Sequence, residues 1–232
     1  MRVRAVVFDL FGTLVPEFPL PEWDAMFRAM AVALDADPVD FRREWDQTVV
    51  ERQTGVFRDI EENVRAICRR LGVVPTEDAV ARALEIRAEL YGRRFQPQPG
   101  AVETLSWLRD HGFRTALVSQ CTPDTPALWH ASPMADLIEV LVFSSEVGLR
   151  KPDPAIYLAA TEPLGVDPTA CLYVGDGSYR ELSGAAAVGM TPVRIVDRSE
   201  PDAVLRPDRD DWEGTTIDSL NEVIALLEGA GA

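Results

Sequence analysis

The sequence predicts an α/β protein in which a doubly wound parallel sheet carries an inserted all-helical segment. Two observations lead to this prediction. Short apolar runs that end in polar residues alternate with helical patterns after about residue 98. Between about residues 22 and 95 the period changes, and helical patterns follow one another without a convincing strand. We therefore expect a core domain of residues 1–15 and 98–232 and a helical domain of residues 16–97.

The first expected strand runs from residue 5 to residue 8 and delivers Asp9 to its carboxyl end. Gly12 and Thr13 follow almost at once, which indicates a sharp turn after the strand. In an open α/β sheet this edge is where ligands bind. A single aspartate could instead do no more than cap a turn, so the argument for a functional site depends on the later segments.

The helical segment contains four apolar-periodic stretches. An Asp37-Pro38 pair opens the second stretch, and Thr76 opens the fourth; these are the residue types that begin helices. The four stretches are residues 22–34, 38–51, 60–71 and 76–91.

The remaining strands and helices alternate along the second part of the chain. Strands are expected at residues 114–119, 137–143, 171–175 and 191–196, and helices at residues 101–110, 154–162, 181–188 and 220–227. Residues 197–213 are expected to form an irregular acidic excursion. Alternation of this kind predicts that the strand ends meet at one edge of the sheet.

Charged residues suggest that the site binds a cation and a phosphoryl group. The strand at residues 171–175 ends at Asp176, which would lie near Asp9, and two adjacent carboxylates repel each other unless a cation lies between them. Magnesium is the natural candidate, because it prefers hard oxygen ligands. Among 23 basic residues 22 are arginine, and the only lysine is Lys151, in a polar loop. A compact ammonium group suits neutralisation of a nucleophile or a phosphoryl oxygen.

Four motifs in order resemble those of the haloacid dehalogenase superfamily, over about residues 4–196. They are Asp9-Leu10-Phe11-Gly12-Thr13, Leu117-Val118-Ser119, Lys151-Pro152-Asp153-Pro154, and Gly175-Asp176-Gly177-Ser178 with Glu181. The resemblance implies that the helical domain is a mobile cap and that Asp9 is the nucleophile. It also implies that Ser119, Gln120 and Lys151 hold phosphoryl oxygens.

The same resemblance supplies a metal site and a substrate loop. The metal ligands would be Asp9, the backbone carbonyl of Phe11, Asp176 and Glu181, although Glu181 could instead only favour a helix N-terminus. The connection between the second and third cap helices would contact substrate through Gly55, Phe57 and Arg58. An equally good explanation is that Gly55 only ends a helix and Phe57 only forms a hydrophobic staple.

Phe11 departs from the phosphatase pattern, in which a second aspartate at this position protonates the leaving oxygen. Three functions therefore stay open: a magnesium-dependent phosphatase that favours good leaving groups, a metal-independent 2-haloacid dehalogenase, and a catalytically weak phosphate-binding module. The Gly-Asp-Gly sequence at residues 175–177 differs from the Ser-Ser-Asn of the dehalogenases, which favours the phosphatase.

Composition and charge set outer limits on the partners. The net charge is −15, acidic residues are spread along the chain, and no basic patch appears, which argues against a nucleic-acid or membrane surface. We expect a small-molecule substrate and a monomer or homodimer. The chain has no signal peptide pattern and no run of eighteen apolar residues, so we expect a cytoplasmic protein. Three cysteines without CxxC spacing suggest neither disulfides nor zinc.

Overall fold

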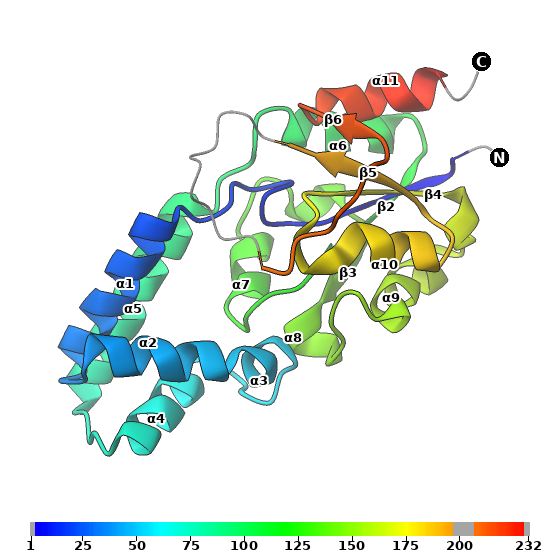
Figure 1. The fold of residues 1–232 in the computed structure, drawn as a ribbon. Helices are drawn as coiled ribbons and strands as arrows, with labels where there is room; N and C mark the ends of the chain where they lie inside the picture. The colour runs from blue at the N-terminus through cyan, green and yellow to red at the C-terminus, as the bar shows by residue number, and fades with distance from the viewer. Residues whose placement is uncertain (1–2, 197–206, 230–232) are drawn as a thin grey trace.

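A computed structural model describes residues 3–196 and 207–229 of the chain. It contains a six-stranded parallel sheet in the order β3-β2-β1-β4-β5-β6 (Figure 1). The strands are β1 (Ala5–Phe8), β2 (Arg114–Ser119), β3 (Val140–Phe143), β4 (Cys171–Gly175), β5 (Thr191–Ile195) and β6 (Thr216–Ile217). The doubly wound parallel sheet predicted from the sequence is confirmed.

The first strand lies at the centre of the sheet, and this determines where the site forms. Phe8 pairs with Leu117 of β2 on one side and with Val174 of β4 on the other. The residues that follow these three strands therefore emerge together at the carboxyl edge. All four residues of β1 are buried, as expected for a parallel strand that is covered on both faces.

Helices cover both faces of the sheet (Figure 1). On one face α6 (Ala101–Asp110) and α11 (Asn221–Gly229) pack over Val6 and Phe8. On the other face α9 (Pro154–Leu164) and α10 (Glu181–Ala187) pack over Ala5 and Val7. Successive side chains of β1 thus point into two different hydrophobic clusters, as the period of a strand requires.

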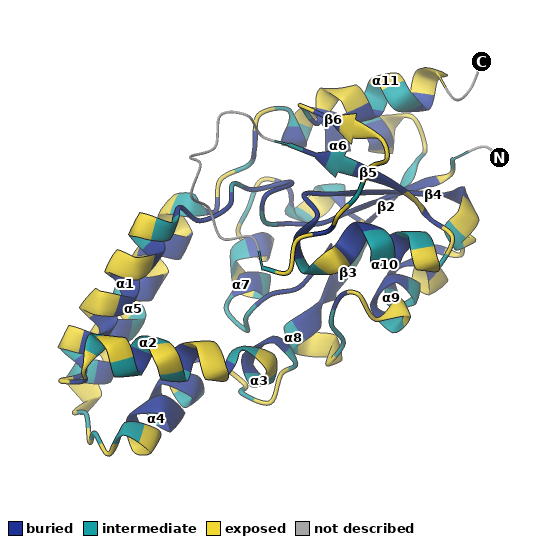
Figure 2. Cartoon of the chain, in the orientation of Figure 1, coloured by how far each residue is buried: buried dark blue, intermediate teal, exposed yellow. Residues whose placement is uncertain are grey.

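The inserted helices pack around a hydrophobic cluster of their own (Figure 2). They are α1 (Leu20–Ala33), α2 (Pro38–Gln47), α3 (Val49–Gln53), α4 (Ile60–Leu71) and α5 (Glu77–Arg94). The predicted helix starts are confirmed, since the Asp37 carboxylate accepts from two backbone amides of α2 and the Thr76 hydroxyl accepts from the amide of Ala79. We call residues 20–94 the helical insertion. That it forms a separate cap domain stays a prediction.

The structure differs from the expected elements in three places. The helix expected over residues 38–51 is divided at Thr48, whose hydroxyl donates to the carbonyl oxygens of Glu44 and Trp45. The third strand starts at Val140, because a 3₁₀ turn occupies Ala135–Leu137. The short elements α7 (Thr125–His130), α8 (Ser144–Val147) and β6 carry too few residues for periodicity to detect. Residues 197–206 of the expected acidic excursion lie outside the described residues.

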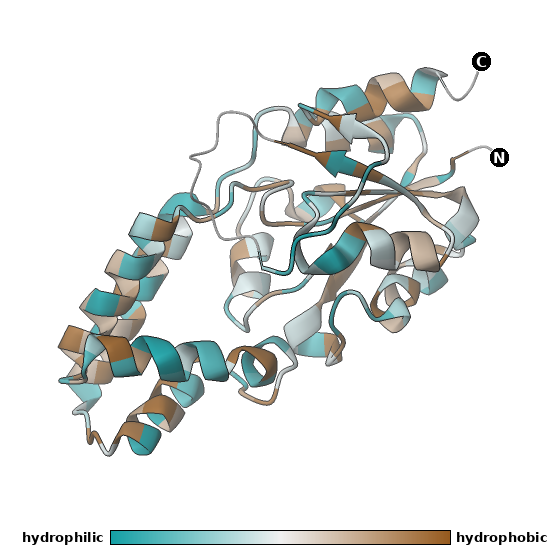
Figure 3. Cartoon of the chain, in the orientation of Figure 1, coloured by the Kyte–Doolittle hydropathy of each residue, from teal (hydrophilic) through white to brown (hydrophobic). Residues whose placement is uncertain are grey.

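Hydrophobic residues are concentrated in the sheet and on the inner sides of the helices (Figure 3). Among the described residues, no helix is both long and apolar enough to cross a membrane. The two chain segments that enter and leave the helical insertion lie side by side. The backbone amide of Gln98 donates to the Leu14 carbonyl oxygen over 2.8 Å.

Candidate active site

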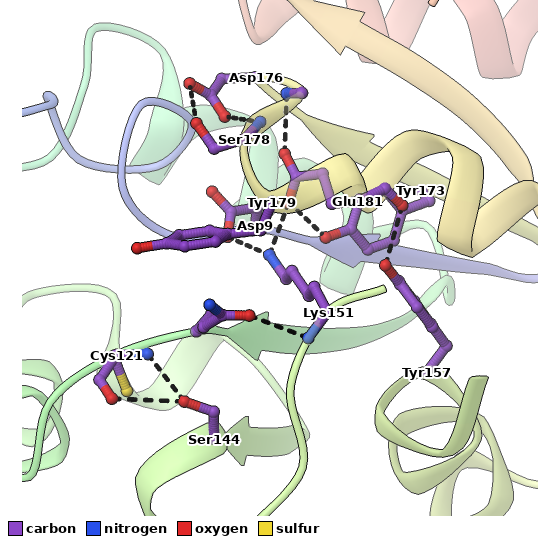
Figure 4. Close-up of polar contacts among 12 residues, drawn as sticks. Asp9, Cys121, Ser144, Lys151, Tyr157, Tyr173, Asp176, Ser178, Tyr179 and Glu181 are labelled. Carbon is purple, nitrogen blue, oxygen red and sulfur yellow. Dashed lines mark hydrogen bonds and ion pairs between the residues drawn. The ribbon is translucent and has the colours of Figure 1, made fainter. Parts of the chain in front are cut away.

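Asp9, Lys151 and Glu181 form the centre of the site at the carboxyl edge of the sheet (Figure 4). The Lys151 ammonium donates to Asp9 Oδ1 and, over 2.6 Å, to Glu181 Oε2. The Asp9 amide donates to the Val174 carbonyl oxygen, which ties the end of β1 to β4. All three side chains are almost fully buried. The residues predicted as nucleophile and cation therefore meet, although 142 positions separate them in the chain.

Glu181 is held in place by three donors besides burial. Its carboxylate accepts from Lys151, from the Tyr173 hydroxyl at 2.8 Å and from the Gly177 amide at 2.9 Å. A Cβ atom on Gly175 would lie 2.3 Å from Glu181 Oε1. Because Gly175 has no side chain, the Glu181 carboxylate can occupy the space beside the end of β4.

Asp176 is oriented by its own loop. One carboxylate oxygen accepts from the Ser178 amide at 2.8 Å, and the other accepts from the Ser178 hydroxyl at 3.0 Å. A Cβ atom on Gly12 would lie 2.8 Å from Asp176 Oδ2, and Gly12 has a φ of +75°. Glycine at position 12 therefore allows the turn after β1 to lie directly against Asp176.

The buried charges perturb one another strongly. Burial raises the pKa of Asp9 above its usual value and Asp176 adds to this effect, while Lys151 opposes it. Burial and then Asp9 raise the pKa of Glu181 to about 8. Burial alone would lower the pKa of Lys151, but Asp9 and Glu181 raise it well above its usual value. Lys151 is accordingly a permanent cation, and the carboxylates need further positive charge to ionise fully.

Three carboxylates are placed so that they could share a metal ion. One ligand oxygen from each of Asp9, Asp176 and Glu181 lies within 4.8 Å of the other two. When all three carboxylates are ionised, they and the Lys151 ammonium leave two negative charges, which a divalent cation would balance. The donor set consists only of oxygen and therefore fits a hard cation. That the Phe11 carbonyl is a further ligand stays a prediction.

A pocket of about 560 Å³ opens from this cluster toward the helical insertion. Its volume lies in the range of small-molecule sites. Phe11 lines it and contacts Phe18, Tyr91 and Phe95, with ring centroids 5.5 to 6.5 Å apart. The lining residues from the insertion and its neighbouring connection include Glu17, Phe18, Trp23, Arg42, Trp45, Asp46, Val49, Arg52, Gln53 and Tyr91.

The predicted phosphoryl-binding residues differ in their access to this pocket. Gln120 and Lys151 line it, and the Gln120 side chain accepts from the Lys151 amide at 2.9 Å. Ser119 is buried and does not line the pocket. Its hydroxyl bonds to no nitrogen or oxygen of the described residues. A role for Ser119 in binding phosphate stays a prediction.

The predicted substrate loop does not line the pocket. A Cβ atom on Gly55 would lie 2.4 Å from the Ser145 carbonyl oxygen, so this glycine packs against the core. The Arg58 side chain is 84% exposed and pairs with Glu62. Phe57 is half-buried outside the pocket lining. Substrate contact by these three residues stays a prediction, and the structure places the preceding Arg52 and Gln53 in the pocket instead.

Two pocket residues that the sequence did not single out join the insertion to the core. The Gln53 amide group donates to the Tyr179 hydroxyl at 3.1 Å and accepts from the Gln120 amide group at 2.9 Å. Tyr179 has a φ of +55°, which is unusual for a bulky residue. The sequence offered one signal for Tyr179: it lies between two parts of the fourth motif, the Gly-Asp-Gly-Ser run at residues 175–178 and Glu181.

Comparison with known proteins identifies the family. A model of the haloacid dehalogenase-like hydrolase family matches residues 3–189. The chain belongs to this family. A glyceraldehyde 3-phosphate phosphatase of Methanopyrus kandleri is 30% identical over 97% of both chains. An (S)-2-haloacid dehalogenase 4A of Burkholderia cepacia is 25% identical over 86% of this chain and 85% of its own. The crystal structure of a HAD phosphatase from Thermococcus onnurineus covers 99% of both chains with a TM-score of 0.67 and 24% identity.

Membership of the haloacid dehalogenase-like hydrolases makes the chain an enzyme that carries out hydrolysis. The predicted resemblance is thus confirmed. The Methanopyrus relative, similar over nearly the whole chain, makes a phosphatase the better supported class.

Proposed function

We propose that this protein is a magnesium-dependent phosphatase for small phosphorylated metabolites. The observation that carries the proposal is the buried cluster of Asp9, Asp176 and Glu181 around a single lysine. Without a metal, burial and mutual repulsion favour the protonated forms of Asp9 and Glu181, which would weaken Asp9 as a nucleophile. A bound magnesium ion would supply the missing positive charge and polarise the phosphoryl group.

In this proposal an oxygen of Asp9 attacks phosphorus, the ester oxygen leaves with its electron pair, and water later hydrolyses the aspartyl-phosphate. Lys151 opposes the rise in the pKa of Asp9, which favours the ionised nucleophile, and it offers charge to the phosphoryl oxygens. Gln120 holds the backbone that carries Lys151. Gln53 lines the pocket from the side of the helical insertion, and its hydrogen bond to Gln120 joins the insertion to the core beside Lys151.

Phe11 limits the substrates in this scheme, because its ring cannot protonate a leaving oxygen. The aromatic contacts around Phe11 also keep this side of the pocket apolar. Phosphates whose leaving group departs readily as an anion are therefore favoured. Glyceraldehyde 3-phosphate belongs in any substrate panel, because it is the substrate named for the Methanopyrus relative.

A 2-haloacid dehalogenase is the second candidate, and one observation favours it. Halide leaves without a proton, so an aromatic residue at position 11 suits this reaction. The carboxylate of Asp176 beside Asp9 weighs against it, because a metal-independent attack on carbon gains nothing from a second buried negative charge.

The experiment measures phosphate and halide release from a panel of phosphorylated metabolites, acetyl phosphate and 2-chloropropionate. Each substrate is assayed with magnesium and with chelator, for the wild type and for Asp9→Asn. We expect phosphate release that requires magnesium and is lost in Asp9→Asn, which should remain folded because an amide fills the same space. Halide release in chelator would assign the protein to the dehalogenases. The absence of any turnover would favour a phosphate-binding module.

A further inference from the structure

Arg52 of α3 is a buried cation that pairs with no acidic side chain among the residues described. Its exposed fraction is 3%, and it lines the pocket. Its Nη1 donates to the Trp45 carbonyl oxygen, the Thr48 hydroxyl and the Asn63 side-chain oxygen at 2.8 to 3.0 Å. All three acceptors are neutral, and within the described part of the chain no carboxylate forms an ion pair with Arg52.

Two neighbouring arginines of the insertion are neutralised. Arg87 is equally buried, but its Nε donates to Asp124 Oδ2 at 2.8 Å. Arg42, at the pocket, pairs with Asp24 and Asp46. Burial, followed by the repulsion of Arg87, lowers the pKa of Arg52 to about 10, so Arg52 remains charged at neutral pH. A buried charge without a counter-ion is costly, which indicates that a ligand supplies the missing negative charge.

The free edge of the Arg52 guanidinium is suited to an anion. Nη1 has its acceptors, whereas Nε is buried without any hydrogen-bond acceptor, and Nη2 donates to no described residue. The Arg52 guanidinium carbon lies 4.1 Å from the Trp45 ring centroid, and this stacking fixes the plane of the group. Nη2 is therefore the nitrogen of this fixed guanidinium that can donate to an oxygen of an anion in the pocket.

The anion site would lie in the same pocket as the reacting group. Gln53, the next residue along α3, contacts Gln120, which in turn accepts from the backbone of Lys151. Arg52 and Asp9 line the same pocket, Arg52 from the helical insertion and Asp9 from the core. Arg52 is therefore placed to contact the part of the substrate that is not transferred.

We propose that Arg52 binds a carboxylate of the substrate, so that the enzyme selects phosphate monoesters that also carry a carboxylate. One negative charge balances the one charge of Arg52, so a singly charged carboxylate fits better than a second, dianionic phosphoryl group. This inference rests on the proposed phosphatase function and specifies its substrate class.

The test compares 3-phosphoglycerate with glycerol 3-phosphate, which has a hydroxymethyl group in place of the carboxylate. In the wild type we expect kcat/KM to be about tenfold or more higher for 3-phosphoglycerate, mainly through KM. Arg52→Gln should abolish this preference. Arg52→Lys keeps the positive charge but not the planar guanidinium group, so it should retain a small part of the preference. Arg65→Gln is the matched control, because Arg65 pairs with Glu61 and Glu77 outside the pocket and its loss should leave the preference intact.

A binding measurement separates this inference from the proposed function. Isothermal titration with D-glycerate, which has no phosphate to hydrolyse, should show binding to the wild type that is about tenfold weaker in Arg52→Gln, with glycerol not binding to either. Equal binding to both proteins, or a wild type without preference between the two phosphates, would overturn the role of Arg52. Glycerate binding that depends on Arg52, together with no hydrolysis of acetyl phosphate, would instead retain the carboxylate site and reject the phosphatase.

Discussion

Phe11 determines which leaving groups the proposed phosphatase can release readily. With no acid at this position, rates across a series of phosphate esters should fall steeply as the pKa of the leaving group rises. Phe11→Asp should flatten this dependence and raise the rate for alkyl phosphates, since general acid catalysis contributes about a hundredfold to ten-thousandfold. The measurement is a leaving-group series at saturating magnesium for both proteins. A flat wild-type series would show that another residue donates the proton.

Glu181 predicts how the metal-free protein responds to pH. Its pKa is raised from 4.5 to about 8 on folding, so between these values the folded state holds a proton that the unfolded state releases. Stability should therefore fall as the pH rises from about 4.5 to about 8. One pKa unit corresponds to about 1.4 kcal/mol, so the loss should exceed about 1 kcal/mol.

The measurement is chemical denaturation of the chelated protein at pH 5 and at pH 8. Glu181→Gln should lose much of the decrease, whereas Glu162→Gln, at an exposed position on α9, should behave as the wild type. Magnesium should stabilise the wild type more at pH 8 than at pH 5, because cation binding favours the ionised carboxylates. An equal decrease in all three chelated proteins would contradict the assignment of the raised pKa to Glu181.

At the scale of elements, the strands and the helix starts could be predicted because their signals are local. β2 and β4 match the expected ranges, since each is a short apolar run bounded by polar or turn residues. Thr48 could not be foreseen as a break, because threonine also occurs within helices and its bonds to Glu44 and Trp45 arise only in the folded chain. Arg52 and Gln53 lie on the short helix α3 that follows this break, and both line the pocket. On an uninterrupted helix an arginine is usually read as a solvated surface residue.

Gly55 connects the helical insertion to α8 of the core and gives a prediction at this scale. Gly55→Ala would place a Cβ atom 2.4 Å from the Ser145 carbonyl oxygen, which should push α3 away from the core and lower kcat/KM by about tenfold or more. Gly72→Ala is a matched control, since Gly72 has a φ of +70° against +73° for Gly55 but nothing within 4 Å of the added atom. Both variants should lose stability to backbone strain. Equal kinetics in the two would show that the contact with α8 does not position the pocket.

At the scale of the whole molecule, the distribution of hydrophobic clusters predicts how far the core depends on the helical insertion. The sheet and its helices enclose two clusters, and the insertion encloses a third. Among the residues that the structure describes, Phe11 and Leu128 are the partly buried ones that contact both the insertion cluster and a core cluster. Since so little apolar surface is shared, we expect the core to fold without the insertion.

A variant that joins Val15 to Gln98 through a short Gly-Ser linker tests this expectation, because Leu14 and Gln98 are already hydrogen-bonded neighbours. It should unfold cooperatively, remain monodisperse and retain hydrolysis of acetyl phosphate with magnesium, since Asp9, Lys151, Asp176 and Glu181 all belong to the core. It should lose any preference for a carboxylate-bearing substrate, because Arg52 leaves with the insertion. The same deletion in Asp9→Asn controls for contaminating phosphatase. A variant that aggregates or shows no cooperative unfolding would mean that residues 16–97 and the core fold as one unit, and that the expected division into two domains is wrong.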